Sequence, residues 1–489
     1  MSVVRRTLLK TTAGAAGAAV AGPFAGLVAM PANAYQAPNP GALLPIADLR
    51  DGKVRLHLPS GFQYRSFHDT ESPVILTDGT TLPGRHDGMG AFAGPSGSVL
   101  LVRNHEVNNP GPPFGPGTPY DSMARGGTTT IQVTPTGEVI RAFTSLNGTM
   151  MNCSGGRMPW GAWVTCEETV NGPDVGPDFT GTSNVPLTKP HGYVFEVPVS
   201  HVPGSGQSTR TPITQAGRFA HEAVSFDPRG GHLYLTEDDF AFPSGFYRYL
   251  PPQNPMSVGR LLDGGTLQML KVKGVTNAHL EAAQATGRSY DVEWVDIPEP
   301  DVAYPYTPGV AAPTPNDTAL RHVSSQGLAQ GAAGFSRLEG QVYADGIVYF
   351  TSTQGGGAAE SGPDSVGGYG NGSGQVWAYD SYRRKLTCVF QSPGPLVLDL
   401  PDNITTSNDG TLVVCEDNIN DNYIRGLTPE GELFDIALNR LRSSSGADRS
   451  NDEFAGSTFS PSGQTLFVNI QASAGLTFAI WGPWTKIGV

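Results

Sequence analysis

The sequence has few charged residues and, among them, few cations. Only 15% of the 489 residues are charged, and 31 Lys and Arg stand against 44 Asp and Glu, which gives a formal net charge of −13. Residues 1–34 hold three of the cations and no acid, so the remaining 28 cations against 44 acids leave a charge near −16. A surface of this charge repels nucleic acid and anionic lipid, so we expect neither as a partner.

Cysteine is also scarce. The chain has four cysteines, Cys153, Cys166, Cys388 and Cys415. In an exported protein four cysteines allow two disulfides in three pairings, of which Cys388 with Cys415 is one candidate pair. Cys153 with Cys166 is another, and its alternative is a thiolate that holds a metal.

The start of the chain lacks the long apolar run of a membrane anchor. The stretch RRTLLK at residues 5–10 is a twin-arginine motif, Thr11–Met30 is rich in Ala and Gly, and the triplet ANA at residues 32–34 is a cleavage site. Residues 1–34 are therefore predicted to be a signal peptide read by the twin-arginine export machinery, with no membrane association after cleavage. We expect a periplasmic or secreted protein that folds around its cofactor before export.

Glycine and proline, in contrast, are abundant, with 63 Gly and 41 Pro. This composition is typical of a loop-rich β protein. One pattern recurs six times: a Gly-containing turn, a short apolar strand, and a polar or acidic end. The copies are Gly97–Glu106, Trp160–Glu168, Gly230–Asp239, Asp345–Thr353, Asp409–Asn418 and Gly463–Gln471. Six such units predict an all-β fold, a six-bladed β-propeller with loop and short-helix insertions, and the alternatives are a β-sandwich or a run of unrelated hairpins.

The domain organisation follows from the spacing of these copies. We expect residues 35–489 to form a single propeller domain and the protein to be a monomer. The widest gap lies between the third and fourth copies, and it predicts an insertion at about residues 255–330 over one face of the propeller. Within it, His279–Ala285 is predicted to form a short helix.

The most unusual stretch is Asn152–Glu168, which reads NCSGGRMPWGAWVTCEE. Thiolate and carboxylate together favour a metal with some softness, such as iron or zinc, whereas clustered carboxylates alone favour calcium or magnesium. The two glycines allow the backbone to come close to whatever the first thiol holds. The alternative is a β-strand with two buried cysteines and a solvated Glu pair.

Acidic groups recur near the ends of the repeated strands. They lie at 104–106 (NHE), 167–168 (EE), 221–222 (HE), 237–239 (EDD), 337–339 (RLE), 402–403 (DN), 416–418 (EDN) and 451–453 (NDE). Loops at one end of a propeller channel converge, and acids brought together there would repel one another without cations. Their convergence would indicate calcium or a similar ion. The alternative is that each group is a turn or capping acid that faces water.

Arg337 and Glu339 stand two residues apart, so on a strand both side chains point to one face. An arginine beside metal-bound carboxylates is suited to bidentate binding of phosphate oxygens. The alternative is a structural ion pair between Arg337 and Glu339.

Together these motifs resemble the PhoX family of exported bacterial alkaline phosphatases. The matching segments are RR at 5–6, the stretch at 152–168, GRFAHE at 217–222, SRLEG at 336–340, LPDN at 400–403 and EFAGSTFSPSG at 453–463. They span most of the mature chain in order, and the match at 152–168 is the specific one.

The resemblance implies a propeller with a buried cluster of iron and calcium ions that hydrolyses small phosphorylated substrates. Cys153 would be a thiolate ligand to iron. Glu168, Glu222 and Glu339 would be carboxylate ligands shared by iron and calcium, and Glu167 is a further candidate.

Arg337 would be the catalytic residue that binds the substrate phosphate, while the metals neutralise the phosphoryl oxygens and activate the nucleophile. One departure from the family pattern is Thr169, which follows the Cys-Glu-Glu run where relatives often carry Asn; the next asparagine is Asn171.

Two other functions fit the same residues. A calcium-dependent propeller hydrolase of the lactonase type would bind calcium alone and need no thiol. A non-catalytic metal-binding propeller would hold little metal, or calcium in a structural role.

Overall fold

The computed structural model describes residues 40–363 and 367–489. The predicted signal peptide and its cleavage site therefore lie outside the described residues. Within them, helices are limited to α2 (Asn316–Leu320), α3 (His322–Ala329) and four short 3-10 turns, and the remaining regular structure is β-strand. Among the described helices, none is both long and apolar enough to span a bilayer.

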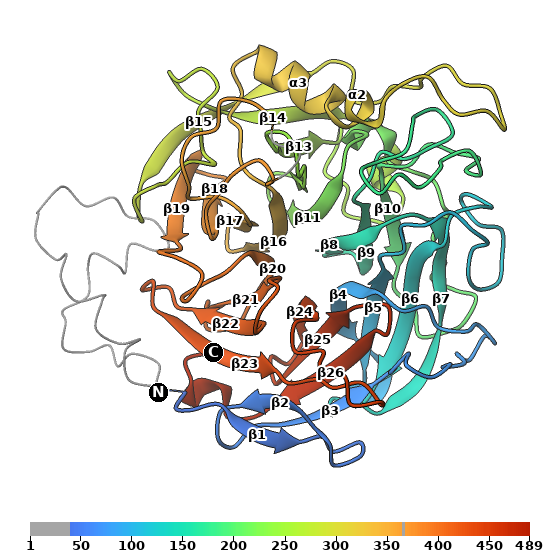
Figure 1. Ribbon diagram of the computed structural model, residues 1–489, viewed down its shortest axis with the longest axis vertical. Helices are drawn as coiled ribbons and strands as arrows, with labels where there is room; N and C mark the ends of the chain where they lie inside the picture. Colours follow the sequence, from blue (N-terminus) through green and yellow to red (C-terminus); the bar gives the residue numbers. More distant parts are fainter. Residues whose placement is uncertain (1–39, 364–366) are drawn as a thin grey trace, which may run out of the picture.

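The strands are arranged in antiparallel units around a common centre (Figure 1). From the innermost strand outward, the first three units are β4 (His86–Ala93), β5 (Val99–His105), β6 (Gly126–Val133) and β7 (Val139–Thr149); β8 (Asn152–Met158), β9 (Ala162–Glu167) and β10 (Val194–Pro198); and β11 (His221–Asp227), β12 (His232–Glu237), β13 (Phe246–Leu250) and β14 (Thr266–Val272). The next three are β16 (Leu338–Ala344), β17 (Ile347–Ser352), β18 (Gln375–Asp380) and β19 (Lys385–Gln391); β20 (Pro401–Thr406), β21 (Leu412–Glu416), β22 (Tyr423–Leu427) and β23 (Leu433–Asn439); and β24 (Glu453–Phe459), β25 (Thr465–Gln471), β26 (Leu476–Trp481) and β3 (Gln63–Phe67).

The innermost strands form a closed ring. Contacts run from β4 to β8, β11, β16, β20 and β24 and back to β4, which is the arrangement of a propeller. The prediction of an all-β propeller is confirmed. Its units are not all separate sheets, because β15 (Ser289–Ile297) pairs with both β14 and β19 and joins two units into one nine-stranded sheet.

The N-terminal strands close the ring at its last two units. β3 pairs with β26, so that the final unit contains strands from both ends of the described chain. β1 (Leu44–Ala47) and β2 (Val54–Leu58) form a hairpin that pairs with β23 through β2. The first strands of the chain and the last ones are therefore held in the same sheets.

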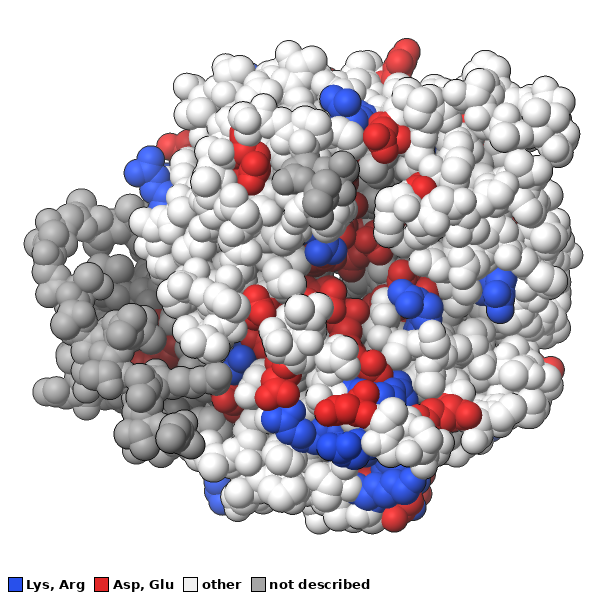
Figure 2. Space-filling view, in the orientation of Figure 1, with Lys and Arg blue, Asp and Glu red and all other residues white. Residues whose placement is uncertain are grey.

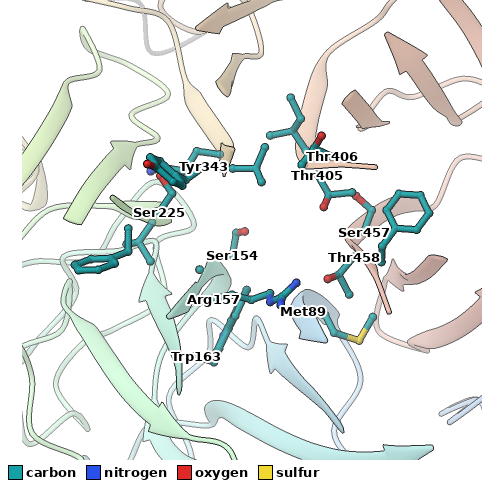
Figure 3. Close-up of a pocket in the computed structure, with 18 of the residues that line it drawn as sticks. Met89, Ser154, Arg157, Trp163, Ser225, Tyr343, Thr405, Thr406, Ser457 and Thr458 are labelled. Carbon is teal, nitrogen blue, oxygen red and sulfur yellow. The ribbon is translucent and has the colours of Figure 1, made fainter. Parts of the chain in front are cut away.

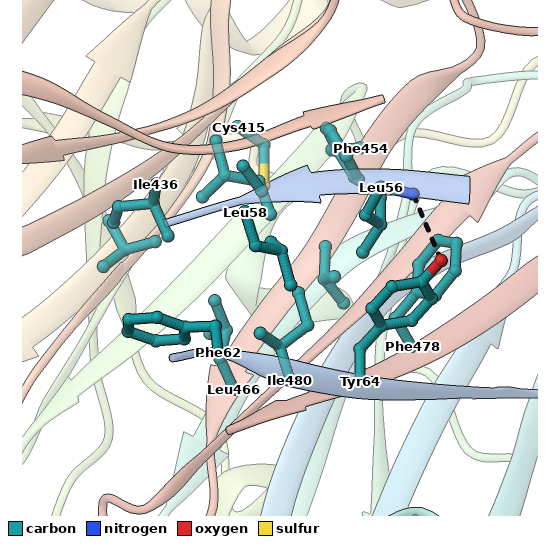
Figure 4. Packing of buried hydrophobic residues seen from close by; sticks show 14 of the residues in the cluster. Leu56, Leu58, Phe62, Tyr64, Cys415, Ile436, Phe454, Leu466, Phe478 and Ile480 are labelled. Carbon is teal, nitrogen blue, oxygen red and sulfur yellow. Dashed lines mark hydrogen bonds between the residues drawn. The ribbon is translucent and has the colours of Figure 1, made fainter. Parts of the chain in front are cut away.

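The strands read as apolar runs because most are covered on both faces, as β5 (VLLVRNH) and β25 (TLFVNIQ) show. One core cluster lies between the last two units and the N-terminal strands (Figure 4). There Leu56, Phe478 and Ile480 are fully buried, and the Tyr64 hydroxyl accepts a hydrogen bond from the Leu56 amide at 3.3 Å. This packing joins the last two units to the N-terminal strands.

The region predicted as an insertion contributes regular structure. β14 is the fourth strand of its unit, β15 joins the next unit, and α3 packs on both strands. The predicted helix at His279–Ala285 is wrong: His279 pairs with Gly334 and Ala282 with Gly357, so the segment is held in extended form. The helical residues lie further on, in α2 and α3.

Candidate metal centre

Each of the six innermost strands carries one extra residue near its start. In β11, for example, His221 and Val224 lie opposite Glu237 and Leu235, so three steps on one strand match two on its neighbour. The same irregularity occurs in β4, β8, β16, β20 and β24. Such a bulge bends the strand and re-aims its side chains.

In five of the six units the bulge places one ionisable side chain at the end of the channel. The first bulged residues are Asp87, Cys153, Glu222, Glu339, Asp402 and, in the last unit, Gly456. A second set of acids directly follows the second strand of four units: Glu106, Glu168, Asp238 and Asp417. Acidic side chains accordingly gather around the central hollow of the molecule (Figure 2).

The acids and one thiol form three groups that share members. The groups are Cys153, Glu168 and Glu222; Glu222, Glu339 and Asp402; and Asp402, Asp417 and Glu453. In each group one potential ligand atom per residue lies within 4.8 Å of the others. Because Glu222 and Asp402 are shared, the groups form one continuous run, which we call the acidic run.

The electrostatics of the acidic run are those of a site built for cations. Burial raises the pKa of Glu222 well above its usual range, and the neighbouring Asp402 raises it further. Burial together with Asp417 raises the pKa of Asp402 to about 7. Burial and then the carboxylates of Glu222 and Glu168 raise the pKa of the Cys153 thiol. Cations in the run would offset this repulsion. A thiolate beside carboxylates suits a metal with some softness, and carboxylates alone suit a harder cation.

The cysteines form no disulfide, since all four lie within the described residues and all are unpaired. Cys153 lies with its Sγ 3.3 Å from the His221 carbonyl oxygen and joins the acidic run. Cys166, Cys388 and Cys415 are buried in the core. The thiol of Cys153 is therefore the one that the fold brings to the carboxylates among the described residues.

Glu167 is directed away from the acidic run. Its carboxylate accepts hydrogen bonds from the backbone amides of Met150 (2.9 Å) and Gly192 (2.9 Å) and contacts His191 Nδ1 at 2.6 Å. Consecutive residues of a strand point to opposite faces, so Glu167 and Glu168 separate at the end of β9. Of the five predicted metal-binding residues, the fold brings together Cys153, Glu168, Glu222 and Glu339, and leaves Glu167 outside the three groups.

Arg337 lies at the edge of the acidic run, just before β16. Its Nε and Nη2 donate to Asp238 at 3.1 and 2.8 Å, and Nη2 also donates to Glu339 at 2.9 Å. Its guanidinium lies over the Phe240 ring, 5.8 Å from the centroid. Nη1 makes no hydrogen bond to the described residues, so one edge of the guanidinium remains for a ligand.

Thr169, which departs from the family pattern, and Asn171, the next asparagine, are both engaged in the local structure. Thr169 Oγ1 accepts a hydrogen bond from the Asn171 amide at 3.0 Å. The Asn171 side chain donates to Asp178 and accepts from Asn184 and Asn316. Asn171 is therefore used in holding the loops together and does not replace the missing asparagine.

Sequence reasoning left four residues around the acidic run out of the predicted site. Asp402, Asp417 and Glu453 were recognised as recurring acids but were not named as ligands, and Asp87 was not singled out. The available signal was position: each first bulged residue lies at the start of a strand that precedes one of the six repeated copies.

Comparison with known proteins agrees with this architecture. The family model described as Alkaline phosphatase PhoX matches residues 43–140 and 135–474. Among solved structures, PhoX of Pseudomonas fluorescens in complex with vanadate, a transition state analogue, is 18% identical, with 90% of this chain and 97% of that chain covered and a TM-score of 0.63.

Two more distant structures also match. A gluconolactonase from Xanthomonas campestris is 12% identical (90% and 97% covered, TM-score 0.40), and virginiamycin B lyase from Staphylococcus aureus is 12% identical (86% and 99% covered, TM-score 0.37). A search of curated protein sequences found no significant match. The family model spans most of the chain, and the chain belongs to the PhoX family of alkaline phosphatases, which are phosphoric ester hydrolases.

Proposed function

We propose that this protein is an exported phosphatase that hydrolyses small phosphate esters with iron and calcium ions held by the acidic run. The observation that carries the proposal is the run itself, in which one thiol and several buried or half-buried carboxylates from five units meet at one end of the channel. Bound there, the metals would supply Lewis-acid neutralisation of the phosphoryl oxygens and an activated nucleophile.

The chemistry of the side chains indicates which residues would bind which metal. Cys153 offers the only sulfur of the three groups and would hold the softer iron, together with Glu168 and Glu222. The oxygen-only groups around Asp402 suit calcium.

Arg337 would orient the substrate. Two of its nitrogens are fixed by Asp238 and Glu339, so the free Nη1 edge is held in a defined position from which it can donate to a phosphate oxygen. Phe240, which is partly exposed beside it, limits the movement of the guanidinium. This preorganisation is the contribution that an arginine makes to binding a phosphoryl group.

Export belongs to the proposal as well. The twin-arginine motif at residues 5–10 supports transport by the twin-arginine machinery to the periplasm or the medium. We propose that the mature protein acts there as a monomer, with no nucleic acid or membrane partner.

The decisive experiment is elemental analysis of protein purified after native export, paired with assays of an aryl phosphate and a lactone. Iron with calcium and phosphate-ester hydrolysis is the expected result. Calcium alone with lactone hydrolysis would replace the proposal by a lactonase-type enzyme. Little metal and no hydrolysis would leave a binding propeller.

A further inference from the structure

A second polar cavity lies further along the same channel. Its volume is about 520 Å³, a size typical of small-molecule sites. All six innermost strands line it, through Met89 of β4 and residues 154–158, 224–226, 341–343, 403–406 and 457–459. Along each of these strands the cavity residues follow the first bulged residue, so the cavity and the acidic run occupy successive levels of the channel.

Three hydrogen-bonded residues of the cavity lining lie next to the acidic run. The Asn403 side chain donates to Ser154 Oγ at 3.2 Å and accepts from Ser457 Oγ at 3.3 Å. Ser154 and Asn403 directly follow Cys153 and Asp402 in the chain. The second cavity is therefore distinct from the acidic run and has its own lining.

The lining of the cavity reverses the charge of the rest of the protein. Among the described residues that line it there is no Asp or Glu, although the chain as a whole carries −13. The single charged side chain is Arg157. Figure 3 shows Arg157 between Met89 and Trp163, with Ser154, Ser225, Tyr343, Thr405, Thr406, Ser457 and Thr458 set around the opening.

Arg157 has no acidic partner within the described residues. Its guanidinium lies over the Phe92 ring, 5.4 Å from the centroid, and it makes no ion pair. This stacking holds the face of the guanidinium and leaves its N–H edges for a ligand. Arg337 and Arg218, in contrast, each form an ion pair with a carboxylate.

Hydroxyl groups elsewhere in the cavity lining supply further donors. Neither Thr405 nor Thr458 makes a side-chain hydrogen bond to the described residues, and both line the cavity. Tyr343 and Ser225 are already engaged, with Asp227 and Gln341 respectively. An unpaired arginine among free hydroxyls and without carboxylates suits an oxyanion and disfavours a metal ion.

We propose that this cavity is a second anion site, which binds a small oxyanion of the phosphate or sulfate class through Arg157. Free phosphate and the phosphate group of a small ester share this chemistry, and both would be accepted. The site is independent of the proposed metal centre, because none of its lining residues belongs to the acidic run.

The test is calorimetric titration of the metal-loaded mature protein with inorganic phosphate and, separately, with inorganic sulfate and a non-hydrolysable alkyl phosphonate. The variant Arg157→Gln should weaken binding of all three probes at the second site by about tenfold or more, because a charge-assisted hydrogen bond is lost. Arg157→Lys should retain part of the affinity. Arg141→Gln removes the same charge outside the cavity and should bind as the unmodified protein does.

An assay of aryl phosphate hydrolysis distinguishes an effect on this site from an effect on the proposed catalytic site. Arg157→Gln should keep kcat within about twofold of the unmodified protein, which also shows that the variant is folded. Superimposable titrations of Arg157→Gln and Arg141→Gln would overturn the proposal, as would the absence of an Arg157-dependent binding event at millimolar probe. Arg157-dependent binding in a protein without any hydrolysis would contradict the proposed function and still support the second site.

Discussion

At the scale of single residues, the thiol of Cys153 distinguishes the acidic run from a calcium site built of oxygen alone. Replacing it with alanine (Cys153→Ala) should abolish iron loading and reduce kcat by about a hundredfold or more, since changes behind the ligands alone cost 10–100-fold. Calcium should be partly retained, because the groups around Asp402 contain no sulfur. Elemental analysis and an aryl phosphate assay on the same sample measure both effects.

The matched control is Cys388→Ala. Cys388 is equally buried, but its Sγ contacts the Phe390 carbonyl at 3.4 Å and lies in the core. This variant should lose some stability and keep its iron. An active Cys153→Ala enzyme without iron would contradict the assignment of the thiol.

Arg337 provides the second prediction at this scale. Arg337→Gln should lower kcat/KM for an aryl phosphate by about 10–100-fold, because a charged hydrogen bond to the phosphate is lost. The metal content should stay unchanged. The control is Arg85→Gln, which removes another cation beside the acids, since Arg85 pairs with Glu106. A loss of metal in Arg337→Gln, or equal effects in both variants, would show that Arg337 only neutralises Asp238 and Glu339.

His191 gives a prediction on pH. Burial by itself lowers its pKa, but the carboxylates of Glu167 and Asp121 raise it to about 9. A folded-state pKa above the unfolded value near 6.5 means that the stabilisation is complete below pH 6.5 and is lost as pH rises through 9. The free energy of unfolding should therefore fall by about 3 kcal/mol between pH 6.5 and pH 10 on this account. Urea unfolding of the unmodified protein and of His191→Gln tests it, since the variant should lack this part of the pH dependence.

The residue scale also marks one limit of the sequence. Cys153, Glu222 and Glu339 could be proposed from their motifs, and the structure brings them together. The sequence favoured Glu168 but kept Glu167 as a further candidate, because adjacent strand residues face opposite sides and the facing depends on the register of β8 and β9. That register shifts at the bulge between Asn152 and Gly155, which has no sequence mark of its own.

At the scale of the element, the bulge at the start of the innermost strands is the device that aims the acids. In β24 its first residue is Gly456, with φ +61°, and an added Cβ would lie 2.3 Å from the Asp87 carbonyl oxygen. Gly456→Ala should therefore cost about 2–3 kcal/mol of stability, from backbone strain and overpacking together, and disturb the neighbouring bulge of β4.

Thermal unfolding and metal content measure this effect. The control is Gly161→Ala, because Gly161 also has a positive φ of +78° but an added Cβ would meet nothing within 4 Å. It should cost about 1 kcal/mol and leave the metal content unchanged. Equal losses in both variants would mean that the bulge of β24 does not shape the acidic run.

The elements explain why Asp87 was missed. The six repeated copies in the sequence correspond to β5, β9, β12, β17, β21 and β25, which are the second strands of their units. Innermost strands such as β4 (HDGMGAFA) and β8 (NCSGGRM) are rich in glycine and polar residues, because they approach one another closely at the centre. They therefore lack the apolar run by which a strand is recognised.

At the scale of the whole molecule, the acidic run joins residues from five units, so its cations would act as a common link between them. Chelation should lower the thermal midpoint and destabilise the protein by about 4 kcal/mol if the metals are present at a thousandfold excess over their dissociation constant. Differential scanning calorimetry with and without chelator, followed by re-addition of calcium, checks this. An unchanged midpoint after complete metal removal would exclude a linking role.

The overall architecture could be predicted from the recurring strands, but its details could not. The pairing of β15 with β19, which fuses two units, depends on how far Ser289–Ile297 extends and leaves no local signal. The second anion cavity also has no motif, since its lining is one short segment from each innermost strand.

The union of β3 with β26 has a consequence for the order of events in the cell. β26, the partner of β3, is synthesised after all the other described strands, so the circle stays open until β26 has left the ribosome. The side chains of the acidic run, at the centre of the ring, cannot all take up their positions before then. Ion loading of the complete acidic run would then follow the synthesis of β26 and the closing of the ring.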